Sequence, residues 1–110
     1  MQVPLTVSFR GIDVDDVIRD ACWAEAEKLE RFYERITSCH VTVGRAMRRR
    51  KGNGFALHVR LALPGGTIVV DHPVHESPGP AVRVAFDEVR RQLQDFAQRQ
   101  RGEEKRHAES

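Results

Sequence analysis

Alternation of apolar and polar positions predicts four strands in this chain. Residues 2–10 alternate with a period of two, and residues 36–45 do the same. A third alternating run begins at Phe55, and a fourth covers residues 67–71. Because successive side chains of a strand point to opposite faces of the sheet, each run has one apolar and one polar face. Four half-buried strands need a second layer to cover the apolar face.

The segment between the first two strands has the spacing of an amphipathic helix. Asp13 or Asp15 can cap the free N–H groups at its start. Trp23 falls away from the apolar stripe, so we expect it to be partly exposed. The apolar positions recur at steps of three and four, and they are Val14, Ile18, Cys22, Ala26, Leu29 and Tyr33.

A second helix is predicted after a proline-rich loop over residues 72–80. Pro80 suits its first turn. We expect Gly102 to end this helix and residues 103–110 to form a flexible charged tail. The apolar stripe consists of Val82, Ala85, Phe86, Val89, Leu93, Phe96 and Ala97.

The order β-α-β-β-β-α indicates a two-layer α+β domain over residues 1–102. We expect a four-stranded mixed sheet with two helices on one face. The first two strands, joined through a helix, should be parallel, and the others should form an antiparallel meander. Gly52-Asn53-Gly54 and Pro64-Gly65-Gly66 supply the two turns of that meander.

Charge is segregated along the chain, although the net charge is only +2. Residues 11–34 hold eight acids and three bases, which gives −5. Residues 35–70 hold seven bases and no acid, which gives +7. A net charge near zero argues weakly against a nucleic-acid-binding protein, but a long acid-free segment favours one.

The sharpest basic feature is the turn after the second strand. It carries five bases within seven residues: Arg45, Arg48, Arg49, Arg50 and Lys51. Such a cluster is typical of a surface that binds phosphate, because each neutralised phosphate releases a counterion. The alternative is a solvated loop tip that protects a sheet edge by its charge.

Two other surfaces can take part in binding RNA. Arg83, Arg90 and Arg101 fall on one flank of the last helix, with Arg91, Gln94 and Gln98 just beyond them. The alternative is a solvated face with ion pairs inside the helix. Arg60 lies on the polar face of the sheet, which is otherwise composed of Thr6, Ser8, Arg10, Ser38, His40, Thr42 and His58. This face lacks paired aromatic residues for base stacking, and it can equally be the hydrated side of the domain.

Nothing in the sequence specifies an active site, so we expect no enzyme and no cofactor. The segment Asp71-His72-Pro73-Val74-His75-Glu76 has metal-ligating residue types, but it lacks a second Cys/His pair, so a polar loop is favoured over a metal site. Cys22 and Cys39 fall on apolar faces, which is typical of core residues rather than nucleophiles. No signal peptide and no membrane span is visible, so we expect a cytoplasmic protein with reduced thiols.

The chain resembles the ribosome hibernation-promoting factor / ribosome-associated inhibitor A family, formerly called sigma-54 modulation proteins, in its short form. The resemblance covers residues 1–102. It rests on the segments Lys28-Leu29-Glu30-Arg31-Phe32-Tyr33, Ile36-Thr37-Ser38-Cys39-His40-Val41, His58-Val59-Arg60, Leu63-Pro64-Gly65-Gly66 and Asp87-Glu88-Val89-Arg90-Arg91-Gln92-Leu93.

The resemblance implies a fold similar to double-stranded-RNA-binding domains. It also implies a translation inhibitor that binds 16S rRNA of the small ribosomal subunit and covers the mRNA channel and tRNA sites of idle ribosomes. Arg90 and Arg91 match basic positions of the family. We expect a free monomer that needs no membrane and no small-molecule substrate. The alternatives are a regulatory protein-interaction domain of the sigma-54 modulation type and a general duplex-RNA-binding module.

The sequence departs from the family pattern at two places. Residues 77–82 replace an acidic and aromatic segment before the last helix, and Glu88 and Asp95 stand where many members are basic. By contrast, the cluster from Arg48 to Lys51 is more basic than in the best-known short members. We therefore expect part of the RNA contact to have moved to this loop.

Overall fold

The computed structural model describes residues 4–45, 55–74 and 78–109. Its elements follow the predicted order, β-α-β-β-β-α. Their bounds are β1 Leu5–Arg10, α1 Asp16–Phe32, β2 Ser38–Arg45, β3 Phe55–Leu63, β4 Gly66–Val74 and α2 Pro78–Glu109. The predicted turn at Gly52-Asn53-Gly54 lies outside the described residues.

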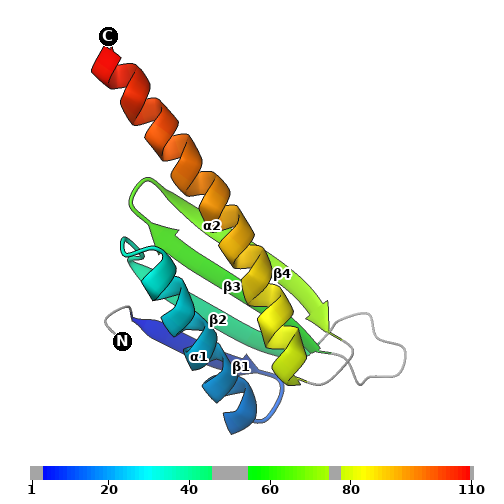
Figure 1. The fold of residues 1–110 in the computed structure, drawn as a ribbon. Helices are drawn as coiled ribbons and strands as arrows, with labels where there is room; N and C mark the ends of the chain where they lie inside the picture. The colour runs from blue at the N-terminus through cyan, green and yellow to red at the C-terminus, as the bar shows by residue number, and fades with distance from the viewer. Residues whose placement is uncertain (1–3, 46–54, 75–77, 110) are drawn as a thin grey trace.

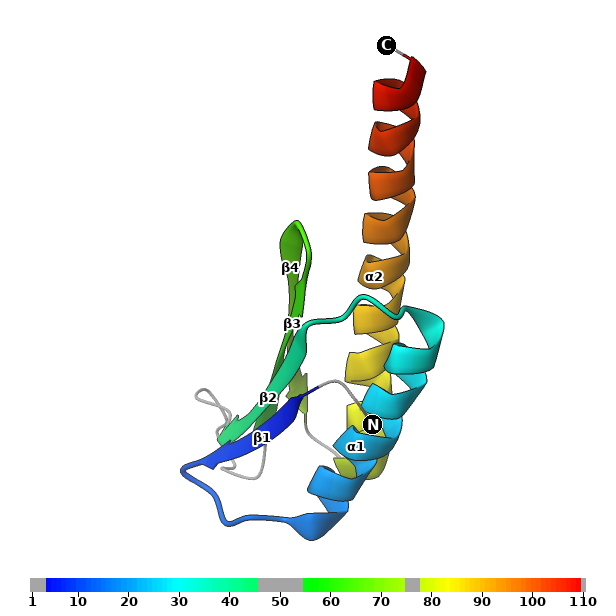
Figure 2. The ribbon, with the colours of Figure 1, turned by 90° about the vertical axis from the view of Figure 1, so that its left-hand side faces the viewer.

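The four strands form one mixed sheet in the order β1-β2-β3-β4. β1 pairs with β2 in parallel, with Val7 opposite Val41. β2, β3 and β4 form the antiparallel meander, and Leu63 pairs with Gly66 across a two-residue turn. Figure 1 shows α1 and α2 crossing the sheet, and Figure 2 shows both helices on the same side of it. The two-layer α+β architecture is thus confirmed.

The core lies between the sheet and the two helices. Val41, Val43 and Val59 from the central strands are fully buried, as are Val82 and Val89 from α2. These are the positions that the period-two and helical patterns assign to the apolar faces. Burial of these side chains is the main force that holds α1 and α2 on the sheet.

Asp15, one of the two residues predicted as candidates, is the N-cap of α1. Its carboxylate accepts hydrogen bonds from the N–H groups of Val17, at 2.9 Å, and Ile18, at 3.3 Å. The helix therefore begins after Val14, which is 59% exposed and does not belong to the buried stripe. The expectation for Val14 was wrong because a capping residue precedes the first helical turn and fixes where the stripe starts.

The predicted loop over residues 72–80 was wrong at both of its ends. β4 continues to Val74 and includes Pro73, which pairs with Ala56. Proline is tolerated there because β4 is an edge strand, where an N–H group can be missing without breaking the ladder. α2 begins at Pro78, so Pro80 lies in its first turn as predicted.

Gly102 does not end α2, which continues to Glu109. A glycine stops a helix when it takes a left-handed conformation, and the described glycines with positive φ are Gly11 and Gly65. Inside a helix, glycine costs only about 1 kcal/mol relative to alanine. Residues 103–108 are mostly good helix formers and include no proline, so nothing in the sequence after Gly102 ends the helix.

The two thiols lie in the core, as predicted, and are not joined by a disulfide. Burial raises the pKa of Cys22 from 9.0 to about 12, with smaller contributions from Cys39 and Glu25. Burial likewise raises the pKa of Cys39 to about 12. Both side chains are therefore neutral thiols at physiological pH and unsuited to nucleophilic chemistry.

This burial predicts a loss of stability at alkaline pH. A thiol whose pKa is higher in the folded than in the unfolded chain stabilises the fold fully below pH 9, and this contribution is lost as the pH rises toward 12. We expect urea unfolding at pH 10 to show a loss of about 1 kcal/mol per thiol, and the C22A/C39A variant to lose less. Rapid reaction of the native protein with Ellman's reagent at pH 8 would contradict this account.

Candidate RNA interface

The basic turn joins two central strands at one end of the sheet. β2 ends at Arg45, whose backbone pairs with Phe55 at the start of β3. Arg48, Arg49, Arg50 and Lys51 lie outside the described residues, so their role in binding RNA stays a prediction. α2 also starts at this end, because it follows the last residue of β4 after a short connection (Figure 1). Arg83, in the second turn of α2, is exposed at the same end of the domain.

Arg60 lies on the opposite face of the sheet from α2. Its neighbours along β3, Val59 and Leu61, are buried under the helices, whereas Arg60 itself is exposed. Figure 2 shows that this face carries no helix. The structure therefore does not bring Arg60 and the arginines of α2 onto one surface, and an RNA that contacts both must reach two faces of the domain.

The open face of the sheet carries the predicted polar side chains of β1, β2 and β3, with the exposed Val69 of β4 opposite Arg60. Arg60 lies opposite His40 of β2, and the Oγ atom of Ser8 lies 3.2 Å from Nε2 of His40. His58 contacts the carboxylate of Asp71 in β4. Hydroxyl, imidazole and guanidinium groups are thus available on this face, together with one carboxylate that repels phosphate.

The arginines of α2 divide into paired and unpaired residues. A terminal nitrogen of Arg90 lies 3.5 Å from Asp87. Nε of Arg91 donates to Glu88 at 3.2 Å. Hydrogen bonds from Arg91 and then Gln92 lower the pKa of the Glu88 carboxyl, so this acid stays ionised beside Arg91. Such ion pairs inside the helix are expected if this face of α2 is only a solvated surface. Their carboxylates compete with phosphate for Arg90 and Arg91, two of the residues predicted to bind RNA.

Arg91 faces a groove of about 580 Å³ between α2 and β4. Three carboxylates line this groove, from Asp71, Asp87 and Glu88. Phosphate is repelled by such a surface, so the geometry separates Arg91 from the other arginines of the predicted flank. The sequence could not predict this separation, because helical spacing alone does not show which flank of α2 lies beside the edge strand β4.

A basic pocket lies beside the flank of α2 that carries Arg101. Arg101 lines a pocket of about 230 Å³ together with Arg35, from the connection between α1 and β2. Arg35 was missed as a site residue. The available signal was its position as the first base of the acid-free segment 35–70, but 66 positions separate it from Arg101. Only the tertiary structure brings the two arginines together.

The outer face of α1 is acidic and unsuited to phosphate. Asp16, Asp20 and Glu27 are exposed there, and Arg19 is held by Asp16 at 3.1 Å. Trp23 is 41% exposed on this helix, as predicted from its position off the stripe. The acidic segment 11–34 therefore places exposed carboxylates on the outer face of α1.

Within the described residues, no cluster of three or more histidine, cysteine, aspartate or glutamate side chains is arranged to hold a metal ion. His75 and Glu76 of the predicted polar segment lie outside those residues. None of the described helices is both long and apolar enough to cross a membrane.

Comparison with known proteins gives one family and one fold. The family model described as "Sigma 54 modulation protein / S30EA ribosomal protein" matches residues 5–101. A ribosomal subunit interface protein from Coxiella burnetii has a TM-score of 0.73 and 15% identity, over 86% of this chain and 98% of that chain. The Protein Y N-terminal domain from Thermus thermophilus has a TM-score of 0.68 and 22% identity, over 87% and 99%. A search of curated proteins found no match.

Proposed function

The chain belongs to the Sigma 54 modulation protein / S30EA ribosomal protein family, and from this premise we propose that it is a ribosome-associated hibernation factor. It binds 16S rRNA of the small subunit near the decoding centre and blocks the mRNA and tRNA sites of idle ribosomes in the cytoplasm. The observation that carries the proposal is the family match over residues 5–101. The fold shared with a ribosomal subunit interface protein supports it.

The charge distribution supports RNA as the direct partner. The +7 segment includes the basic turn, and Arg83 and Arg101 are exposed along one flank of α2. Guanidinium groups reach phosphate and ribose oxygens, which are the accessible groups of a folded RNA helix. The acidic outer face of α1 then points away from the RNA and orients the domain on it.

In this proposal the protein inhibits translation by occupying its site on the ribosome, and it catalyses no reaction. The domain measures 57 × 29 × 19 Å, which is large enough to exclude an RNA strand sterically from the surface that it covers. The S30EA family is not a known enzyme family. We therefore propose that affinity for the ribosome, and not a catalytic rate, sets how strongly translation is inhibited.

Co-sedimentation with purified small ribosomal subunits across a salt series tests this function. We expect association at about 50 mM salt that weakens steeply by about 200 mM, with a log–log slope of roughly 0.7–0.9 per phosphate contact. A plain RNA duplex, measured at the same salt concentrations, is the control. Much weaker binding to the duplex supports the proposal, comparable binding favours a general duplex-RNA-binding module, and no association at low salt refutes it.

A protein-interaction domain is the second candidate function. The groove between β4 and α2 favours it, because Val69 is 44% exposed and Val84 50% exposed there. Exposed apolar side chains beside carboxylates are typical of a protein contact more than of an RNA contact. If a protein were the partner, alanine at Arg48, Arg49, Arg50 and Lys51 would leave binding of that partner unchanged.

A further inference from the structure

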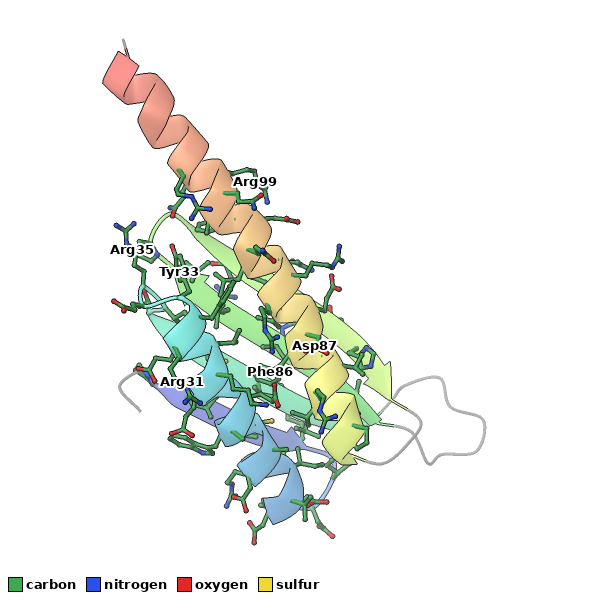
Figure 3. The ribbon with its side chains drawn as sticks, viewed as in Figure 1. Arg31, Tyr33, Arg35, Phe86, Asp87 and Arg99 are labelled. Atoms are coloured by element: carbon green, nitrogen blue, oxygen red, sulfur yellow. The ribbon has the colours of Figure 1, made fainter. Side chains whose placement is uncertain are left out.

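We propose that the pocket between the end of α1 and α2 binds one phosphate group through Arg35 and Arg101. The pocket has a volume of about 230 Å³ and is lined by Tyr33, Arg35, Ala97, Gln100 and Arg101. In Figure 3, Tyr33 and Arg35 lie at the end of α1 beside α2, near the turn between β3 and β4. The phosphodiester of an RNA backbone is the ligand if the proposed function holds, and a free phosphate has the same recognition chemistry.

A hydrogen-bonded frame holds the pocket in shape. The hydroxyl group of Tyr33 donates to Oε1 of Gln100 at 3.2 Å. The amide nitrogen of Gln100 donates to the backbone oxygen of Pro64 at 3.1 Å. These two bonds join the C-cap of α1, the middle of α2 and the β3–β4 turn. Tyr33 and Gln100 are thus held in place before a ligand arrives, which lowers the entropy cost of binding.

Gly65 keeps this frame compact. Its φ angle is +88°, which favours glycine, and a Cβ atom at this position would lie 3.1 Å from Nε2 of Gln100. A side chain at this position would therefore crowd the Gln100 amide. The turn between β3 and β4 thus contacts α2 beside the pocket.

Among the side chains that the structure describes, every ion pair involves residues other than the two arginines of the pocket. Neither Arg35 nor Arg101 therefore has an acidic partner within 4.0 Å among those side chains. By contrast, Arg19, Arg90 and Arg91 each hold a carboxylate. Two guanidinium groups at one cavity repel each other, and an anion that accepts hydrogen bonds from both relieves this repulsion.

The pocket also lies at the end of the basic flank of α2. Arg83, Arg90 and Arg101 share one side of the helix by their spacing, and Arg101 is the member that reaches the pocket. A phosphate held here fixes the far end of an RNA strand that follows this flank. Phosphate contacts of this kind set the register of a protein on RNA without reading its sequence.

The first experiment titrates inorganic phosphate into the ¹⁵N-labelled full chain, with chloride as the ionic-strength control. We expect saturating shifts of the amide signals of residues 33–36 and 97–101 in the wild-type protein. The R35A/R101A variant should lose them. The R31A/R99A variant should retain them, because it removes the same charge from two exposed arginines outside the pocket (Figure 3). Y33F keeps both charges but breaks the frame, so we expect binding about threefold weaker.

The second experiment measures small-subunit binding of the same variants. We expect R35A/R101A to bind about tenfold more weakly than R31A/R99A, with the log–log salt slope reduced by about 0.7–0.9 relative to that control. If phosphate saturates the pocket but the two double variants bind subunits equally, the pocket stands with a free phosphate compound as its ligand. If phosphate gives no saturating shift, the pocket is refuted, even where the wild-type protein binds subunits. If the wild-type protein does not bind subunits, the proposed function fails, and the titration alone decides the pocket.

Discussion

Replacing Phe86 with alanine is expected to lower the free energy of unfolding by about 3–5 kcal/mol. Phe86 is 1% exposed and belongs to the cluster of buried residues between the helices and the sheet. Figure 3 shows it on α2, in the region between the two helices. The shorter side chain leaves a cavity that rigid neighbours fill only in part, so the loss exceeds the transfer free energy of the ring alone. Urea denaturation followed by circular dichroism measures the effect.

Val84→Ala is the matched control for this prediction. Val84 lies on the same helix, two residues earlier, and is 50% exposed. Its replacement changes stability by about 0.5 kcal/mol at most, because alanine has the better helix propensity and little buried surface is lost. A comparable loss in both variants would mean that α2 does not pack on the sheet as described.

The elements defined by a local period could be predicted from the sequence. The alternation of residues 36–45 and the steps of three and four from Ile18 to Leu29 depend only on which side faces the core. Every second residue of a strand, and every residue of one helical stripe, points to that same side. Buried Val41, Val43 and Leu29 confirm this. The turn at Pro64-Gly65 was also predictable, because a positive φ strongly favours glycine.

The ends of β4 and α2 could not be predicted in the same way. Pro73 is compatible with a strand only because β4 is at the edge of the sheet, and strand order is a property of the whole fold. Gly102 can end a helix or continue one, and the outcome depends on the conformation that its neighbours impose. Both errors arose where one residue type permits two local structures.

The candidate site was predictable only in part as a set of residues, and not as a surface. Helical spacing places Arg83, Arg90 and Arg101 on one flank, whereas ion pairing with Asp87 depends on side-chain conformation. The separation of Arg60 from α2 was implicit in the strand pattern, since the polar face of a two-layer sheet is the face without helices. The pairing of Arg35 with Arg101 follows from tertiary contacts alone.

Replacing Arg48, Arg49, Arg50 and Lys51 with alanine is expected to weaken binding to small ribosomal subunits about a hundredfold or more. Each phosphate contact that is lost reduces the log–log salt slope by about 0.7–0.9, so four contacts reduce it by roughly three. The residues belong to the acid-free segment, and no acid between residues 35 and 70 competes with phosphate for them. Sedimentation binding curves at several salt concentrations measure both the affinity and the slope.

A pair of charge-matched variants separates this local effect from a change in net charge. R49A/R50A and R19A/R31A each remove two positive charges, the second pair from the acidic helix α1. We expect R49A/R50A to bind subunits about tenfold more weakly and to lose roughly 1.5 units of slope. R19A/R31A should stay within about twofold of wild type, because the exposed carboxylates of α1 repel phosphate and Arg19 is already paired with Asp16. Equal weakening by the two variants would mean that the charge of the whole domain, and not the turn between β2 and β3, sets the affinity for the ribosome.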